Sequence, residues 1–203
     1  METFDWVKRA FTEGTIFTAF DLETTGLDPR ADRIVEIGAV KFDKRGLIAR
    51  FSALIDPGIP MPAEAGRVNH ISDEMLRGKP SLDEVFPDFL LFIKNTVLAA
   101  HNAPFDCGFI NEKLKERWEK KEQTLPFMNK AWSPPFPALP NPIADTLGFS
   151  RDQIPGRRSY SLQNLAMELG IHAVNAHRAE DDARLCMNIF LHIYHLTQPQ
   201  KKE

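Results

Sequence analysis

The chain has 203 residues, of which 43% are hydrophobic and 26% charged, and its formal net charge is −3. This length suits one compact domain with a sizeable core, and the small negative charge excludes a protein that coats nucleic acid through a broad basic surface. No stretch approaches the roughly 20 apolar residues of a membrane span, and the N-terminal residues do not read as a secretory signal, so we expect a cytoplasmic protein. Cys107 and Cys186 lie in apolar helical patterns and are expected to be reduced core residues.

The first half of the chain predicts a short helix followed by strands. Residues 1–12 have an amphipathic pattern that suits a lead-in helix. Turn signals such as Thr25-Gly26 and Arg45-Gly46 then separate segments rich in β-branched and aromatic residues. These segments predict three strands, at 15–22, 34–42 and 47–55, which form an antiparallel meander.

The second half alternates helices with a buried strand. Ser81 and Glu84 form a capping-box pattern before a helix, and the continuously apolar residues 96–100 predict a strand buried on both faces. Further helices are predicted at about 104–120, from Ser161 to Gly170, and at about 179–196. This order indicates an α/β domain with a mixed sheet. The six prolines of residues 121–142 predict a long loop or lid.

Two carboxylates lie at the end of the first predicted strand. Side chains alternate faces along a strand, so Asp21 and Glu23 project to one side while Phe20 and Leu22 point to the other. Two adjacent acids raise each other's pKa unless a cation lies between them. Taken alone, the pair also fits a solvated strand end, because short motifs have many false positives.

A third carboxylate follows the buried strand. Asn102 can cap the next helix and Pro104 suits its first turn, which places Asp106 at the helix start. An acid there often complements the helix dipole. However, Phe109 and Ile110 follow three and four positions later, so Asp106 borders the apolar face of the helix.

The last predicted helix adds a fourth carboxylate. Its apolar stripe, extended backwards, reaches Asp182, whereas Glu180 and Asp181 fall within reach of Arg184 as surface acids. A partly buried carboxylate is costly unless it is paired or metal-bound. Asp182 is therefore the predicted ligand among the three.

A histidine, His177, precedes this helix. Such a histidine is commonly structural, but beside a water held by a metal it becomes a candidate general base, because imidazole titrates near neutrality. Four carboxylates and a histidine together predict an oxygen-rich pocket for two hard cations, Mg²⁺ or Mn²⁺, about 4 Å apart.

Three segments carry these residues in order: FDLETTGLD from Phe20, HNAPFD from His101 and HRAEDDA from His177. They resemble the three Exo motifs of the DEDDh (DnaQ-like) exonucleases, a family that includes the proofreading epsilon subunit of bacterial DNA polymerase III and, more distantly, RNase T and oligoribonuclease. The resemblance implies a ribonuclease H-like α/β fold, with a mixed five-stranded sheet and flanking helices. It also implies a single exonuclease domain over residues 1–203, with its core at about 15–196.

The resemblance implies roles for individual residues. His177 would deprotonate the attacking water, and two divalent metal ions would be bound by Asp21, Glu23, Asp106 and Asp182. The terminal nucleotide would be held by Thr24, Thr25, Leu27 and Phe105. A turn is the alternative explanation for the two threonines, and core packing is the alternative for Leu27 and Phe105.

Some positions depart from the family pattern or leave two interpretations open. The segment from Val68 to Ile71 reads Val-Asn-His-Ile where Val-His-Gly-Ile is usual, so His70 is displaced by one position and a plain loop role is its alternative. Aromatic residues of the proline-rich insert would stack on bases or dock a partner, or else cover apolar surface: Phe127, Trp132 and Phe136. Arg157 and Arg158 would contact phosphates or belong to a flexible basic loop.

Together these features predict a metal-dependent 3′-to-5′ exonuclease that acts on DNA, preferably single-stranded, and releases nucleoside 5′-monophosphates in proofreading or repair. RNA 3′-end trimming is the alternative, and a DNA polymerase is a candidate partner. A catalytically silent module that binds nucleic acid or a polymerase is remote, because it has no physical need for mutually repelling acids. A structural calcium site is also remote, because the acids lack the pattern of an EF-hand loop.

Overall fold

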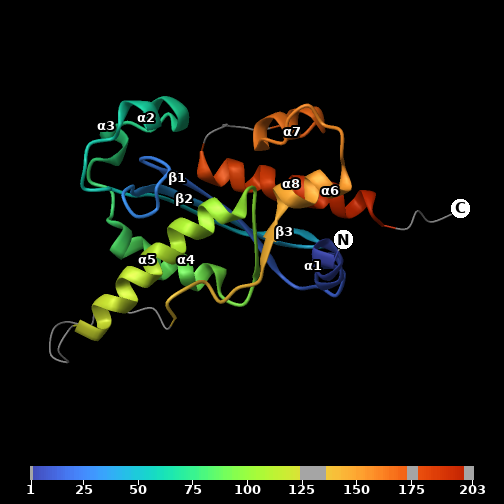
Figure 1. The fold of residues 1–203 in the computed structure, drawn as a ribbon, viewed down its shortest axis with the longest axis horizontal. Coiled ribbons are helices and arrows are strands. Elements are labelled where there is room, and N and C mark those ends of the chain that lie inside the picture. Colours follow the sequence, from blue (N-terminus) through green and yellow to red (C-terminus); the bar gives the residue numbers. More distant parts are fainter. Residues whose placement is uncertain (1, 124–135, 173–177, 199–203) are drawn as a thin grey trace, which may run out of the picture.

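The computed structural model describes residues 2–123, 136–172 and 178–198. Within these ranges a five-stranded sheet, in the order β3-β2-β1-β4-β5, lies between two layers of helices (Figure 1). The first three strands form an antiparallel meander, and β4 and β5 run parallel to β1. The predicted mixed sheet is therefore confirmed. The strands are β1 Phe17–Thr24, β2 Ile34–Asp43, β3 Gly46–Leu54, β4 Val97–Ala100 and β5 Ile143–Asp145.

The helices divide between the two faces of the sheet (Figure 1). One apolar core packs α1 Glu2–Thr12, α6 Thr146–Gln153, α7 Leu162–Glu168 and α8 Ala179–Leu196 against the sheet. A second core lies on the other face, under α4 Leu82–Ile93 and α5 Ala103–Gln123. Two short helices, α2 Ala63–Asn69 and α3 Asp73–Leu76, connect β3 to α4.

The alternation of side chains along β1 positions the site. Phe17 and Ala19 belong to the core under α8, whereas Phe20 and Leu22 belong to the core under α4 and α5. By the same period of two, Asp21 lies on the α8 face of the sheet. Because β1 and β4 are parallel, their carboxyl ends meet at the same edge, where ligands commonly bind in α/β sheets.

Several elements differ from the prediction. Strand β1 begins two residues later than predicted and continues to Thr24, and α5 extends to Gln123, inside the segment expected to be a loop. Strand β5 and helices α2, α3 and α6 were not predicted, because each is short and carries little periodicity. Residues 124–135 of the predicted lid lie outside the described residues.

The cysteines and the apolar content of the helices were also considered in the sequence analysis. Cys107 and Cys186 are both free and buried, as predicted. Of the helices within the described ranges, none combines the length and the apolar content needed to cross a bilayer.

Candidate active site

Three carboxylates meet at the end of β1. Each of Asp21, Glu23 and Asp182 offers one oxygen, and these oxygens all lie within 4.8 Å of one another. The first two come from β1, and Asp182 comes from the first turn of α8, where its side chain is buried at 4% exposure. The predicted convergence of acids distant in sequence is therefore present for these three residues.

The fourth predicted carboxylate approaches from the other side of the sheet. Asp106 lies in the first turn of α5 and is 3% exposed. Its Oδ1 accepts a hydrogen bond of 3.1 Å from the backbone N–H of Leu22, the residue between the two acids of β1. Asp106 thus lies beside the strand end, next to the three-carboxylate group but outside it.

Burial and mutual repulsion dominate the electrostatics of the site. Burial, followed by the charges of Asp106, Glu23 and Asp182, raises the pKa of Asp21 well above its usual range. Burial first, and then the charges of Asp182 and Glu36, raises the pKa of Glu23 to about 8. Burial also raises the pKa of Asp106 to about 8. A bound divalent cation would reverse this effect, so the oxygen donor set fits a hard cation.

Other segments hold the candidate ligands in place, and sequence reasoning did not identify their residues as part of the site. Gln163 of α7 donates a hydrogen bond of 2.8 Å from Nε2 to Oδ2 of Asp182. Asp145, at the end of β5, accepts the backbone N–H groups of Asn102 and Ala103 through Oδ1. The start of α5 is thus capped by a side chain from another strand, although the side chain of Asn102 was expected to cap it.

An ion pair fixes the start of α8. Glu36 of β2 is 1% exposed and accepts hydrogen bonds from Nε and Nη2 of Arg178, the shorter being 2.7 Å, and from the backbone N–H of Ala179. Glu36 lies directly across the ladder from Glu23. Neither residue of the pair was singled out from the sequence, because 142 positions separate them.

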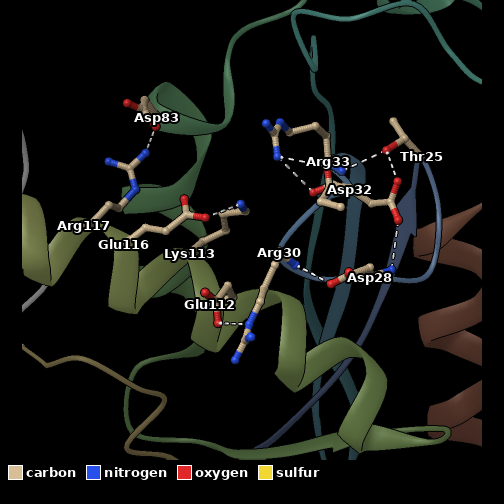
Figure 2. Close-up of polar contacts among 11 residues, drawn as sticks. Thr25, Asp28, Arg30, Asp32, Arg33, Asp83, Glu112, Lys113, Glu116 and Arg117 are labelled. Atoms are coloured by element: carbon tan, nitrogen blue, oxygen red, sulfur yellow. Dashed lines mark hydrogen bonds and ion pairs between the residues drawn. The ribbon is translucent and has the colours of Figure 1, made fainter.

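The turn after β1 has an internal hydrogen-bond network, which Figure 2 shows around Asp32. The hydroxyl of Thr25 donates to Asp32 Oδ1 at 3.2 Å and accepts the backbone N–H of Arg33 at 2.9 Å. The hydroxyl of Thr24 donates to the carbonyl of Gly26. A Cβ at Gly26 would lie 2.4 Å from the Asp32 carboxylate, so a larger residue there would displace the side chain that accepts the hydrogen bond from Thr25. Both threonine hydroxyls therefore hold the turn.

The same turn lines an apolar pocket beside the acids. The pocket has a volume of about 640 Å³, and its lining includes Glu23, Thr24, Thr25, Leu27 and Phe105. Leu27 is 82% exposed, so it does not serve as core packing. Phe105, by contrast, also packs against the core under α5. The structure therefore gathers the four residues predicted to hold the nucleotide, and that role stays a prediction.

The remaining predicted residues lie in different places. His177, Phe127 and Trp132 lie outside the described residues. Phe136 packs against the core under α4 and α5. This agrees with the alternative interpretation, in which it covers apolar surface and does not stack on bases. His70 is the C-cap of α2 with φ 58°, a left-handed conformation that glycine adopts more readily than histidine.

Three further charged residues named in the sequence analysis differ in their surroundings. Glu180 lies 3.7 Å from Arg50 of β3, so its ion pair joins the helix to the sheet. Arg157 forms an ion pair of 3.0 Å with Glu168. Arg158 lines a cleft beside the acids instead.

Comparisons with known proteins agree with this geometry. The exonuclease family RNase_T matches residues 18–190. DNA polymerase III subunit epsilon of Treponema pallidum is 47% identical over 189 residues, which cover 92% of this chain and 80% of that protein. The PolC-type DNA polymerase III of Clostridium perfringens is 37% identical over 85% of this chain, but the match spans 11% of that much longer protein.

Among solved structures, exonuclease X in complex with 5′-overhanging duplex DNA has a TM-score of 0.66 at 22% identity, covering 89% of this chain and 92% of that chain. This likeness shows the fold, and the expected ribonuclease H-like architecture is confirmed. The family match, the epsilon-type relative and the acidic cluster lead to one conclusion. The chain belongs to the RNase_T exonuclease family and is a 3′-to-5′ exonuclease.

Proposed function

We propose that this exonuclease removes nucleotides from the 3′ end of DNA, preferably single-stranded DNA, and releases nucleoside 5′-monophosphates during proofreading. The observation that carries the proposal is the convergence of Asp21, Glu23 and Asp182 within 4.8 Å in a chain of an exonuclease family. DNA is favoured over RNA because one relative is named as a subunit of DNA polymerase III and another as a PolC-type DNA polymerase III.

The acids suit two divalent cations, and we propose Mg²⁺ or Mn²⁺ because the candidate ligands are oxygens. Asp21, Glu23 and Asp182 would hold one ion, and Asp106, beside Asp21, would help to hold the second. When bound, such ions stabilise the attacking and leaving oxygens of a phosphodiester.

The residues of the chain would then position the reaction. Gln163 orients the Asp182 carboxylate through its hydrogen bond. The apolar pocket of Leu27 and Phe105 would receive the terminal nucleoside, which places the last phosphodiester over the acids. His177, the residue before Arg178, would accept a proton from the attacking water.

The cellular setting is proposed from the relatives and from the cysteines. A DNA polymerase is the proposed partner, because one relative is an epsilon subunit and another match lies within a PolC-type polymerase. Two free, buried cysteines fit the reducing cytoplasm. We propose one exonuclease domain, whose core extends over about residues 15–196.

The test is incubation of the purified protein with 5′-labelled single-stranded DNA, matched and mismatched primer–templates, and RNA of the same sequence. With Mg²⁺ or Mn²⁺, DNA should shorten from its 3′ end in single-nucleotide steps, and excess chelator should stop the reaction. Faster digestion of RNA than of DNA would replace the DNA proposal with the RNA-trimming alternative.

Variants test the assignment of residues. Asp182→Ala should abolish cleavage, whereas Asp181→Ala, which removes the neighbouring acid from the helix, should retain it. His177→Ala should slow cleavage by about 10²–10⁴-fold, the range for a positioned base. Substantial turnover by Asp182→Ala would refute the metal-ligand assignment.

A further inference from the structure

A second cleft lies beside the candidate metal ligands and shares part of its wall with the apolar pocket of Leu27 and Phe105. It has a volume of about 740 Å³, and Asp21, Glu23 and Asp182 form one part of its wall. Its lining also includes Arg151, Arg158 and residues 159–163. Acids and guanidinium groups thus face one open, polar cleft.

The two hollows adjoin at the end of β1. Leu22 and Glu23 line both this cleft and the apolar pocket of Leu27 and Phe105. A strand whose terminal base occupies the apolar pocket would pass over the acids and enter the cleft that carries the two arginines. An apolar pocket suits a base, and guanidinium groups suit phosphates.

The two arginines are available for a ligand. Across the described residues, Arg151 and Arg158 take part in no ion pair, and both are exposed. Arg157, between them in sequence, instead forms its ion pair with Glu168. The guanidinium of Arg151 lies over the ring of Tyr160, 6.0 Å from its centroid.

The segment that carries Arg158 is fixed to the active-site end of the sheet. The hydroxyl of Tyr160 donates to the carbonyl of Ile154 at 3.1 Å and closes the loop that Gly156 turns with φ 82°. His101, directly after β4, contacts the carbonyl of Tyr160 through Nε2 at 2.7 Å. The backbone segment that carries Arg158 is therefore held next to the end of β4.

We propose that Arg151 and Arg158 bind a phosphate of the nucleic acid strand on the 5′ side of the bond that is cut. This inference rests on the proposed function, because it assumes that the terminal nucleotide occupies the apolar pocket. The two guanidinium groups would give longer strands a higher affinity than a substrate with a single phosphate, through charge-assisted hydrogen bonds.

The experiment compares two substrates with the complete chain and Mg²⁺. One is a single-stranded DNA oligonucleotide, and the other is the p-nitrophenyl ester of thymidine 5′-monophosphate, whose one phosphate is the one that is cut. Arg158→Gln and Arg151→Gln should each raise KM for the oligonucleotide about tenfold more than KM for the ester, the size expected of one charge-assisted hydrogen bond. The matched control Arg157→Gln should change neither value.

Salt gives an independent measure. Each of the two variants should reduce the slope of log KM for the oligonucleotide against log salt concentration by about 0.7, the value for one phosphate contact on a single strand. If Arg158→Gln and Arg151→Gln match the wild type, or impair both substrates equally, the inference is wrong while the proposed function stands. If the wild type cleaves neither substrate, the proposed function fails, and the inference fails with it.

Discussion

At the scale of single residues, Glu36 shows how a buried charge outside the candidate ligands shapes the site. It is 1% exposed, lies opposite Glu23 on the sheet, and accepts two side-chain donors from Arg178 and the backbone N–H of Ala179. Arg178 also lowers the pKa of Glu23, against the larger effects of burial and the neighbouring acids. One guanidinium therefore limits the repulsion in the site and fixes the helix that carries Asp182.

Arg178→Ala should lower the free energy of unfolding by about 3 kcal/mol, because it leaves the buried Glu36 carboxylate without its cation. Chemical denaturation of the metal-free protein measures this cost. Adding Glu36→Gln to Arg178→Ala should restore part of the loss, since the uncompensated charge is then removed. The control Arg67→Ala removes a pair whose side chains are both largely exposed, and it should cost less than about 1 kcal/mol. Equal costs for Arg178→Ala and Arg67→Ala would contradict the prediction.

The sequence predicted which acids of the site face inward, and local periodicity explains why. The apolar stripe of the last helix selected Asp182, which is 4% exposed, and Phe109 and Ile110 indicated the burial of Asp106. The ion pair of Glu36 and Arg178 had no such local signal. The hydrogen bond from Gln163 to Asp182 also depends on how two helices pack, which sequence spacing does not reveal.

At the scale of elements, the contact between α8 and β2 depends on the absence of a side chain at Gly38. A Cβ there would lie 2.0 Å from the carbonyl carbon of Ala179 and 2.0 Å from the amide nitrogen of Glu180. Backbone atoms cannot move aside as a flexible side chain can. The first turn of α8 therefore lies directly on the central part of the sheet.

Gly38→Ala should destabilise the protein by about 3 kcal/mol and greatly reduce cleavage, because the added methyl group displaces the start of α8 and with it Asp182. Thermal unfolding and the oligonucleotide assay measure the two effects. The matched control is Gly108→Ala in α5, where an added Cβ meets no atom within 4 Å and alanine favours the helix by up to about 1 kcal/mol. Normal stability and activity in Gly38→Ala would show that the contact is not needed.

Long elements with clear periodicity could be predicted, and short ones could not. The last helix has the predicted bounds, Ala179–Leu196, because its apolar stripe continues over five turns. Strand β5 has three residues, fewer than alternation needs to be recognised, and α6 begins directly after it. Asp145, which caps the start of α5, lies at this junction and was missed for the same reason.

At the scale of the whole molecule, topology explains why the acids meet. The parallel pairing of β1 with β4 brings Asp21 and the helix start of Asp106 to one edge, and α8 brings Asp182 from the opposite end of the chain. The net charge of −3 does not reveal this concentration of negative charge. The three motif segments indicated it, because each carried at least one acid beside apolar residues although they are distant in sequence.

This concentration should make the metal-free protein less stable as pH rises. The pKa values of Glu23 and Asp106 are raised to about 8, and that of Asp21 is also raised, whereas the same groups in the unfolded chain titrate near pH 4. Between about pH 4 and 8 the folded state therefore binds more protons than the unfolded state, and the free energy of unfolding falls as pH rises. The contribution of Glu23 and Asp106 to this loss continues through their raised pKa values of about 8 and levels off above them.

Divalent cations should remove this dependence, because they bind the folded state and stabilise the ionised carboxylates. In chelator, Tm should fall by several degrees between pH 5 and 8, since about 1 kcal/mol corresponds to roughly 2–4 °C in a domain of this size. The stabilisation by Mg²⁺ should grow over the same interval, and Asp21→Asn should reduce both the fall and the response to Mg²⁺. Differential scanning calorimetry at four pH values, with and without Mg²⁺, decides the matter. Parallel curves in the two conditions would mean that the crowded acids do not share a cation.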